Sequence, residues 1–473
     1  MFAFAIWDSQ RKRLIIVRDR LGVKPLYWVR SGSGLAFASE VRALLAAGVA
    51  PRSLSLSGLV SFLLMGWLPT PLTLIEGVRL LQPGHLILWE NGRVVVRRWW
   101  EPPPPRGQKT EIAVFGEMVT DAVTSRLISD VPLGVFLSGG MDSTAIMLCA
   151  KRVKEDLIAV GISFDEPLFD EGERQRQVAE EIGCNLRQVR VNAHDLRRNW
   201  QSVLACMDSP SINGINVWFV CLAAKNAGLT VAISGLGGDE VFMGYKIFRR
   251  LKHRLPLTRL LRLVGDISGL FSPNTKTTFS RFGRPVEGLY LLRRACVPLQ
   301  TVRALLGEDT VRCVHNPASL LPRSRGLPPL PRWQRLEMFS YMHDQLLRDA
   351  DQFSMAHSLE VRVPLLDHLL VELVLQQQPR YVLGEQPKWL LARASGMPKR
   401  WTEYPKRGFL FPFEVWFRKH LTDEVCDLLF CNPLQLFNTA AVERLWRHYR
   451  EGRVQWRQIW ALCVVNYWLT QHM

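Results

Sequence analysis

Apolar residues follow two different patterns along the chain, and the change between them divides it in two. Before residue 100 the apolar runs are short, at Phe2–Trp7, Leu14–Val17, Leu26–Val29, Leu35–Ala38, Leu86–Leu88 and Val94–Val96. Charged or glycine-rich clusters separate these runs, and Asn91-Gly92 between the last two is a strong hairpin signal. The pattern predicts an antiparallel sheet, with one helix over residues 53–68.

From about residue 113 onward, apolar runs alternate with stretches of helical periodicity. Strands are expected at Gly134–Leu137, Leu157–Phe164, Leu186–Val191 and Thr230–Ser234, and helices at 143–153, 171–183 and 215–227. Buried strands that alternate with helices predict a parallel sheet with both faces covered. Helical patterns dominate after about residue 240. The fold class is therefore α/β, with an antiparallel first part and a helical C-terminal part.

The clearest boundary is the proline-rich stretch "EPPPPRGQK", Glu101–Lys109. Four prolines can continue neither a helix nor the interior of a sheet. We therefore predict a first domain over residues 1–100, a linker over 101–112 and a second domain over 113–473. A length of 473 residues agrees with at least two domains.

Composition narrows the class of protein. Hydrophobic residues make up 48% of the chain and charged residues 22%, as in soluble globular proteins. No apolar run approaches the roughly 20 residues of a membrane span, and the first residues do not have the pattern of a secretory signal. The nine cysteines show no C-x-x-C spacing, so we expect no disulfide framework or metal centre built from cysteine. The expected location is the cytoplasm.

The net charge of +17 is concentrated between Lys246 and Arg335, where eighteen Lys and Arg stand against four Asp and Glu. Such a stretch can hold nucleic acid or another polyanion, or it can be a solvated basic face. Because aromatic residues that could stack on bases are not interleaved with the charges, we favour the solvated face and expect no nucleic-acid partner.

Two glycine loops carry the candidate chemistry. "LSGGMDST", Leu137–Thr144, stands between an expected strand and an expected helix, where backbone N–H groups and the helix dipole can hold phosphate. It lacks the lysine of a Walker A loop, and Asp142 offers a carboxylate for Mg²⁺. "SGLGGDEVFMGY", Ser234–Tyr245, repeats this arrangement after another expected strand, with Asp239 and Glu240 behind the glycines. Two such loops at one sheet edge can hold one nucleotide with its metal.

Two later segments, Ser358–Asp367 ("SLEVRVPLLD") and Pro405–Phe409 ("PKRGF"), complete an ordered set of four motifs. With them the chain resembles the B-type, glutamine-hydrolysing asparagine synthetases over essentially its whole length. The resemblance implies part of an N-terminal-nucleophile (class II) glutamine amidotransferase domain. It also implies an adenine-nucleotide α-hydrolase-like synthetase domain of the PP-loop type.

The resemblance also implies ATP and Mg²⁺ and assigns roles to residues. The ATP-binding residues would be Ser138, Gly139, Gly140 and Ser143 at the pyrophosphate, and Val160, Ser234 and Gly235 at adenine and ribose. Asp142 and Asp239 would hold the Mg²⁺, and Lys406 would stabilise the leaving pyrophosphate. The implied reaction adenylates a carboxylate, aspartate by default, and then transfers ammonia to give an amide.

The chain departs from the family pattern in its first part. Members of the family begin their glutaminase domain with a nucleophilic cysteine, whereas position 2 here is Phe and no cysteine precedes Cys149. We expect this chain as printed not to hydrolyse glutamine. Two explanations stay open: a start assigned to an internal methionine, or an enzyme that uses free ammonia or another amine.

Two further positions concern the substrate. Leu236 stands where asparagine synthetases carry an acid between two glycines, and Asp349 stands where many relatives carry lysine. Leucine cannot transfer a proton, so another carboxylate substrate is an alternative to aspartate. A peptide or lactam cyclase, a non-catalytic binding homologue and a tRNA-modifying enzyme are the remaining alternatives. The sequence leaves a homodimer open.

Overall fold

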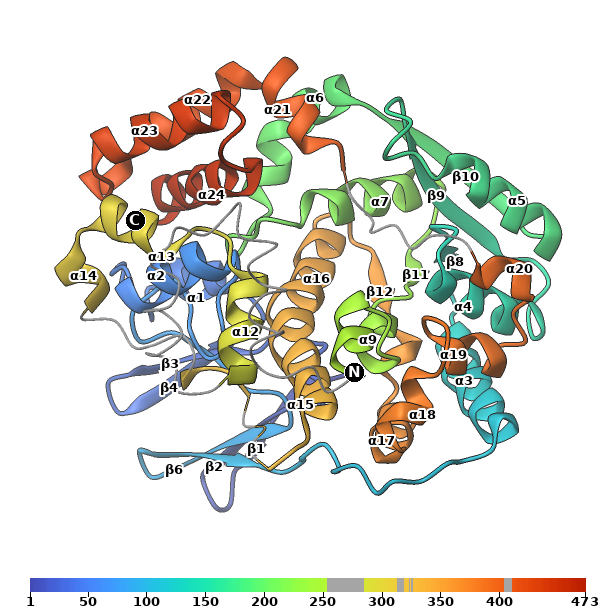
Figure 1. Ribbon diagram of the computed structural model, residues 1–473. Helices are drawn as coiled ribbons and strands as arrows, with labels where there is room; N and C mark the ends of the chain where they lie inside the picture. Colours follow the sequence, from blue (N-terminus) through green and yellow to red (C-terminus); the bar gives the residue numbers. More distant parts are fainter. Residues whose placement is uncertain (253–284, 313–318, 323, 325, 404–410) are drawn as a thin grey trace.

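The computed structural model of the chain describes residues 1–252, 285–312, 319–322, 324, 326–403 and 411–473 (Figure 1). Two antiparallel sheets form the N-terminal part. The first sheet has the order β1-β2-β6-β7, with β1 Ala3–Asp8, β2 Arg13–Arg18, β6 His85–Glu90 and β7 Arg93–Arg98. The second has the order β4-β3-β5, with β4 Gly34–Ala38, β3 Tyr27–Ser31 and β5 Arg79–Leu80. The six predicted strands are confirmed.

The turn chemistry of the first sheet agrees with its sequence. Asn91 and Gly92 both have positive φ, at 50° and 76°, which is the backbone that a two-residue hairpin between β6 and β7 requires. One face of this sheet packs on the second sheet through a small apolar cluster that includes Ile16, Ile87 and Trp28. The helices α1 Val41–Ala46 and α2 Leu56–Met65 follow the first four strands.

A parallel sheet of five strands forms the centre of the second part, in the order β10-β9-β8-β11-β12. Its strands are β8 Leu133–Phe136, β9 Ile158–Phe164, β10 Asn185–Val191, β11 Val231–Ile233 and β12 Glu360–Arg362. The first four were predicted. The sequence did not predict β12, because three residues of mixed polarity within the Ser358–Asp367 motif give no apolar run.

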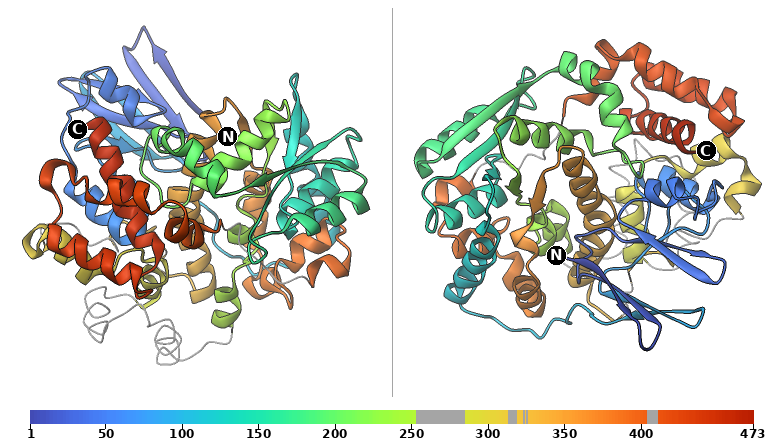
Figure 2. Two further views of the ribbon diagram at one scale, coloured as in Figure 1. Left: turned by 90° about the horizontal axis from the view of Figure 1, so that it is seen from above. Right: turned by 180° about the vertical axis from the view of Figure 1, so that it is seen from behind.

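Helices cover both faces of the parallel sheet, as predicted. Contacts place α5 Gly172–Ile182 and α7 Ile215–Asn226 against β9, and Figure 2 shows helices on both sides of this sheet. The helices α3 Ile112–Leu127 and α4 Met141–Lys151 pack on each other, and α16 Arg348–Met355 packs on α7 and β12. The inner strands β8, β9 and β11 are therefore buried on both faces, whereas the edge strand β10 is largely exposed.

The remaining helices complete the described chain. They are α6 Ala193–Ala205, α8 Gly238–Val241, α9 Lys246–Lys252, α12 Pro285–Arg294, α13 Leu299–Leu306, α14 Glu308–Arg312, α15 Pro329–Leu336, η3 Glu337–Leu347, η4 Pro364–Leu366, α17 His368–Gln376, α18 Pro379–Leu383, α19 Trp389–Ala394, α20 Lys399–Thr402, α21 Phe413–Lys419, α22 Thr422–Phe430, η5 Pro433–Gln435, α23 Thr439–Arg450 and α24 Trp456–His472. The helical C-terminal part agrees with the prediction. Among the described helices, none has the length and apolar character to cross a membrane.

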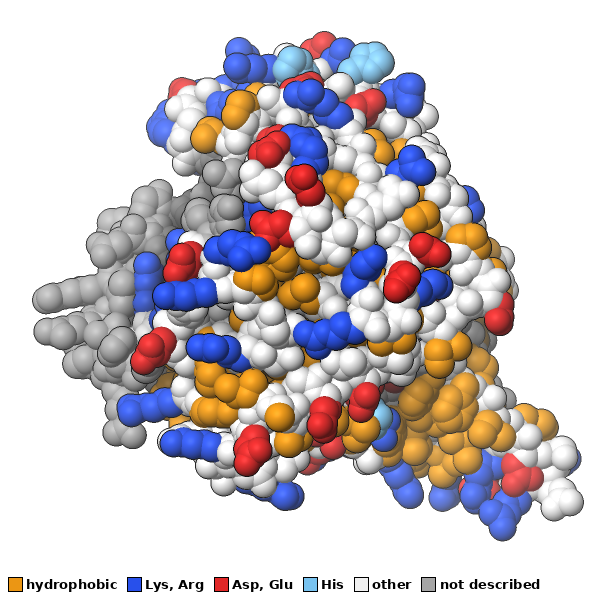
Figure 3. Space-filling view, turned by 90° about the vertical axis from the view of Figure 1, so that its right-hand side faces the viewer, with side chains coloured by type: hydrophobic (Ala, Val, Ile, Leu, Met, Phe, Trp, Pro, Cys, Tyr) orange, Lys and Arg blue, Asp and Glu red, His pale blue; other side chains and the backbone are white. Residues whose placement is uncertain are grey.

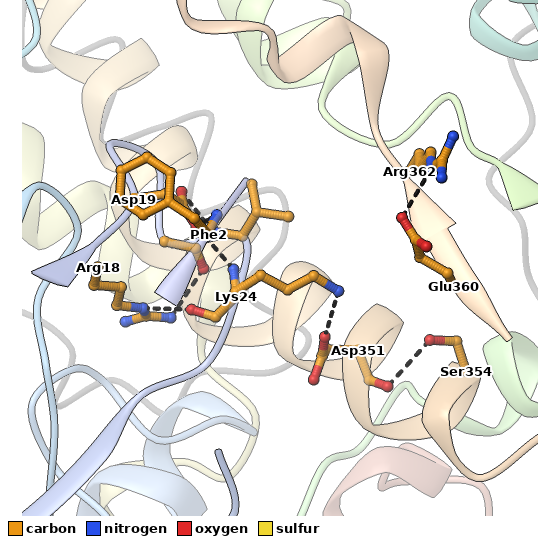
Figure 4. Close-up of polar contacts among 10 residues, drawn as sticks. Phe2, Arg18, Asp19, Lys24, Asp351, Ser354, Glu360 and Arg362 are labelled. Carbon is orange, nitrogen blue, oxygen red and sulfur yellow. Dashed lines mark hydrogen bonds and ion pairs between the residues drawn. The ribbon is translucent and has the colours of Figure 1, made fainter. Parts of the chain in front are cut away.

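Polar contacts join the N-terminal sheets to the second part. Lys24 Nζ lies 3.2 Å from Asp351 Oδ1 on α16 (Figure 4). The buried Asp208 accepts hydrogen bonds of 2.9 Å from the backbone N–H groups of Val41 and Arg42. The carboxylate of Asp208 therefore caps the N-terminus of α1 from the other part of the chain. The linker is also tied down, since Arg106 N donates to Gln376 O at 2.9 Å.

Candidate active site

The first glycine loop joins β8 to α4 and is held by its own serines. The Gly140 N–H donates to Ser138 Oγ at 3.2 Å, and Ser143 Oγ donates to Gly140 O at 3.1 Å. Gly139 has a φ of +72°, a backbone that side-chain-bearing residues rarely adopt. The loop is thus fixed as a turn that leads into the N-terminus of a helix of 11 residues, where phosphate is favourable.

The second glycine loop follows β11, which is the neighbour of β8 in the sheet. Because both strands are parallel, their carboxyl ends bring the two loops to the same edge. The contact between the loops is close: a Cβ added to Gly235 would lie 2.8 Å from Asp142 Cβ, and one added to Gly238 would lie 2.2 Å from Asp142 Oδ1. The predicted neighbourhood of Asp142 and the second loop is therefore present.

Two carboxylates from these loops converge on one ammonium group, that of Lys388. Asp239 Oδ1 lies 2.6 Å from Lys388 Nζ, and Asp142 Oδ2 accepts a short hydrogen bond from the same nitrogen. The Lys388 side chain is 4% exposed, and those of Asp142 and Asp239 are 20% and 21% exposed. Burial alone would lower the pKa of Lys388, but the two carboxylates outweigh it and raise that pKa above its ordinary value. Lys388 is therefore held as a cation.

The sequence prediction missed Lys388. It stands in "GEQPKWLLARA", in which neither composition nor spacing marks the lysine. The structure, and not the sequence, shows one unusual local feature: Lys388 has a positive φ of 52° directly before α19. Such a backbone is uncommon for a residue with a side chain and is often found at functional sites.

Of the remaining predicted site residues, the structure describes Ser234 and Val160 but not Lys406. Ser234 lies at the carboxyl end of β11, where its Oγ accepts from Leu236 N at 3.3 Å. Val160 is fully buried in β9, and its carbonyl oxygen accepts from the Leu137 N–H at 2.8 Å, so it borders the first loop through its backbone. Lys406 and the motif around it lie outside the described residues.

Glu240, the residue after Asp239, is buried and hydrogen-bonded. Glu240 is 1% exposed and accepts a short hydrogen bond from the Tyr245 hydroxyl. Burial, with a smaller contribution from Asp239, raises the pKa of Glu240 to about 7. On β12, the side chain of Glu360 pairs with Arg362 at 2.8 Å (Figure 4). Arg362 also donates to the backbone carbonyls of Arg126 and Ile128, so it ties β12 to the C-terminal end of α3.

Asp349 on α16 is buried, 2% exposed. It accepts a hydrogen bond of 2.9 Å from Ser211 Oγ and one of 3.3 Å from Gln352 Nε2. Burial raises the pKa of Asp349 from 3.8 to about 7, against the opposing hydrogen bond from Ser211. Because its pKa is higher in the folded than in the unfolded chain, the stability that Asp349 contributes is present below about pH 4 and lost as the pH rises to about 7.

Asp349 is expected to lower the unfolding free energy of the wild type by roughly 3 kcal/mol as the pH rises from about 4 to about 7. In the Asp349→Asn variant we expect this decrease to be absent. Denaturant unfolding at a series of pH values measures this. The exposed Asp121 on α3 supplies the control variant, Asp121→Asn, which should keep the wild-type pH dependence. An equal pH dependence in Asp349→Asn and the wild type would contradict the assignment.

Comparison with known proteins places this geometry in a family. A family model described as asparagine synthase matches residues 115–470. The chain belongs to the asparagine synthase family. A second model, described as a glutamine amidotransferase domain, matches residues 1–100. The resemblance that the four motifs predicted is confirmed, and a chain of this family is an amidotransferase.

Curated relatives of this asparagine synthase family chain have low sequence identity to it, but the alignments cover most of its length. It is 26% identical over 502 residues to "Asparagine synthetase [glutamine-hydrolyzing] 1" of Bacillus subtilis, covering 99% of this chain and 77% of that protein. It is 28% identical over 500 residues to a putative asparagine synthetase of Mycobacterium tuberculosis, covering 99% and 76%. It is also 26% identical over 483 residues to "Amidase chry2" of Gibberella zeae, covering 90% and 68%.

Proposed function

We propose that this chain is an ATP-dependent amide-forming ligase that adenylates a carboxylate, releases pyrophosphate and transfers ammonia. The observation that carries the proposal is the meeting of Asp142, Asp239 and Lys388 beside two glycine loops at one edge of a parallel sheet. This is the edge at which open α/β sheets bind nucleotides. In the proposal the residues of the first loop, Ser138, Gly139, Gly140 and Ser143, hold the pyrophosphate.

The two carboxylates suit Mg²⁺, which prefers oxygen ligands and keeps some of them from phosphate or water. No set of three or more His, Cys, Asp or Glu side chains in the described part of the chain could hold a metal, so ATP would complete the coordination. Bound there, Mg²⁺ would neutralise phosphate charge. Lys388 holds oxygens of both carboxylates in this structure, so Mg²⁺ would bind there only if Lys388 released at least one of them, and the ammonium would then be able to face the phosphates.

The adenine and ribose would lie against Val160, within β9, and against Ser234 and Gly235, directly after β11. Lys406 would add a second cation at the leaving pyrophosphate. The attacking amine is proposed to be ammonia, which free ammonium or a glutamine amidotransferase domain can supply.

Aspartate is the default substrate, and asparagine the default product. Leu236 favours a second candidate, another carboxylate, because it places an apolar side chain between Gly235 and Gly237 beside Asp142. An apolar group cannot deprotonate an attacking amine. The relatives named amidase agree with a range of substrates in the family.

Pyrophosphate release from ATP and Mg²⁺ tests the proposal. We expect release with a suitable carboxylate and ammonium, and a fall of about 100-fold or more in Asp142→Ala. Aspartate and a panel of other carboxylates would be compared in the same assay. Absence of release with every carboxylate, from a chain that folds, would overturn the proposal, whereas release with aspartate alone would exclude the second candidate.

A further inference from the structure

A second pocket of ligand size is formed by α18, α19, α20 and the turn between α18 and α19. Its volume of about 610 Å³ lies within the roughly 300–1,000 Å³ of pockets that hold small molecules. None of the described residues that line it belongs to a glycine loop, and Lys388 does not line it either. The pocket is therefore separate from the proposed nucleotide site.

Part of the lining is apolar and aromatic. The rings of Tyr381 and Trp389 stand edge to face, with their centroids 5.3 Å apart. Both rings line the pocket, together with the buried side chains of Ala392 and Met397. Aromatic rings gain more than buried area when they pack against another ring, so this part of the lining suits a flat ring.

Cations outnumber acids around the pocket. Arg380, Arg393 and Lys399 line it, against the single acid Glu385. Within the described part of the chain, neither Arg380 nor Arg393 forms an ion pair, so both guanidinium groups are available to an anion. A guanidinium group can bind a carboxylate or a phosphate through two parallel hydrogen bonds. Figure 3 looks onto the side of the molecule where α3, α19 and α20 lie, and shows Lys and Arg side chains there with hydrophobic side chains between them.

The turn between α18 and α19 holds the pocket in shape. Gly384 has a φ of 53°, and a Cβ there would lie 1.6 Å from Trp389 Cδ1, so only glycine lets the indole pack against this turn. Trp389 Nε1 donates to Tyr381 O at 2.6 Å, and Thr402 Oγ1 donates to Gln386 Oε1 at 3.1 Å. A pocket that is formed before its ligand arrives loses less conformational freedom on binding.

We propose that this pocket binds a small organic anion that carries a flat ring. The ring would lie against Tyr381 and Trp389, and the anionic group would pair with Arg393. An aromatic carboxylate and a nucleoside monophosphate share this chemistry. Gln386 and Trp389 line the pocket and stand close to Lys388 in the sequence, so a bound molecule would contact the turn that carries the cation of the proposed active site.

Isothermal titration calorimetry of the full chain tests the chemistry of the ligand. The probes are indole-3-acetate and AMP, which carry both a ring and a charge, and indole and inorganic phosphate, which each carry one of the two. We expect indole-3-acetate or AMP to bind at least about tenfold more tightly than indole and inorganic phosphate. The tighter of the first two probes tells a carboxylate ligand from a phosphate ligand. If neither of them bound more tightly than indole and phosphate, the proposal would be wrong.

Variants test the place of binding. Arg393→Gln is expected to weaken binding by at least about tenfold, in a chain that still folds because Arg393 is exposed. Arg400→Gln is the matched control, because Arg400 on α20 pairs with Glu181 and does not line the pocket. Asp142→Ala should also leave this binding unchanged, so the result does not depend on the proposed ligase activity. Binding that is indifferent to Arg393→Gln, or that Arg400→Gln weakens equally, would overturn the proposal.

Discussion

Replacing Lys388 with methionine is expected to reduce ATP-dependent pyrophosphate release by about 1000-fold. The substitution keeps most of the side-chain volume and removes the ammonium between Asp142 and Asp239. Two carboxylates that share a site without a cation repel each other, so their geometry and their charge both change. In the proposed mechanism, the cation that would face the phosphates is lost as well.

Stability measurements separate the catalytic from the structural effect of Lys388. Removing one partner of a buried ion pair costs about 3–5 kcal/mol, so Lys388→Met alone should also lower the unfolding free energy. The double variant Lys388→Met with Asp239→Asn removes one of the two negative charges and should recover much of that stability. If pyrophosphate release returned together with stability in the double variant, neither Lys388 nor Asp239 would be needed for catalysis, and the role of Lys388 would be structural.

Replacing Gly238 with alanine is expected to lower pyrophosphate release by about 100-fold in a chain that still folds, because a displacement of about 1 Å at a reacting group costs that much. A Cβ at Gly238 would lie 2.2 Å from Asp142 Oδ1 and 2.5 Å from Asp142 Cγ, far inside contact distance. The carboxylate of Asp142 must therefore move away from Gly238, which changes its position relative to Asp239.

Magnesium dependence provides the specific readout for Gly238→Ala. If Asp142 and Asp239 hold the metal together, moving one of them should raise the Mg²⁺ concentration that gives half-maximal release. Gly116 on α3 supplies the control, because a Cβ there would meet only the backbone of Ala394, at 3.1 Å from its oxygen and 3.9 Å from its carbonyl carbon, and neither carboxylate. Gly116→Ala should leave release and its Mg²⁺ dependence unchanged. Equal Mg²⁺ dependence in Gly238→Ala and the wild type would contradict a shared metal site.

The sequence predicted the parts of the site whose chemistry is local. The glycine loops follow strands that could be predicted from apolar runs, and the residue types of Asn91-Gly92 favour a hairpin turn. In contrast, β12 and Lys388 are defined by distant partners: β12 by its pairing with β11, and Lys388 by two carboxylates more than a hundred residues away. Such long-range pairings leave no periodicity in the sequence, so pattern reasoning cannot detect them.

The cap of α1 by Asp208 limits which recombinations between homologues would preserve the structure. The N–H groups of Val41 and Arg42 have their acceptor, Asp208, in the second part. A recombination event that joined the first hundred residues to a different synthetase part would leave this helix without its acceptor unless the new partner carried one at the same place. An exchange between homologues therefore keeps the cap of α1 only where the incoming second part carries an acceptor at the position of Asp208.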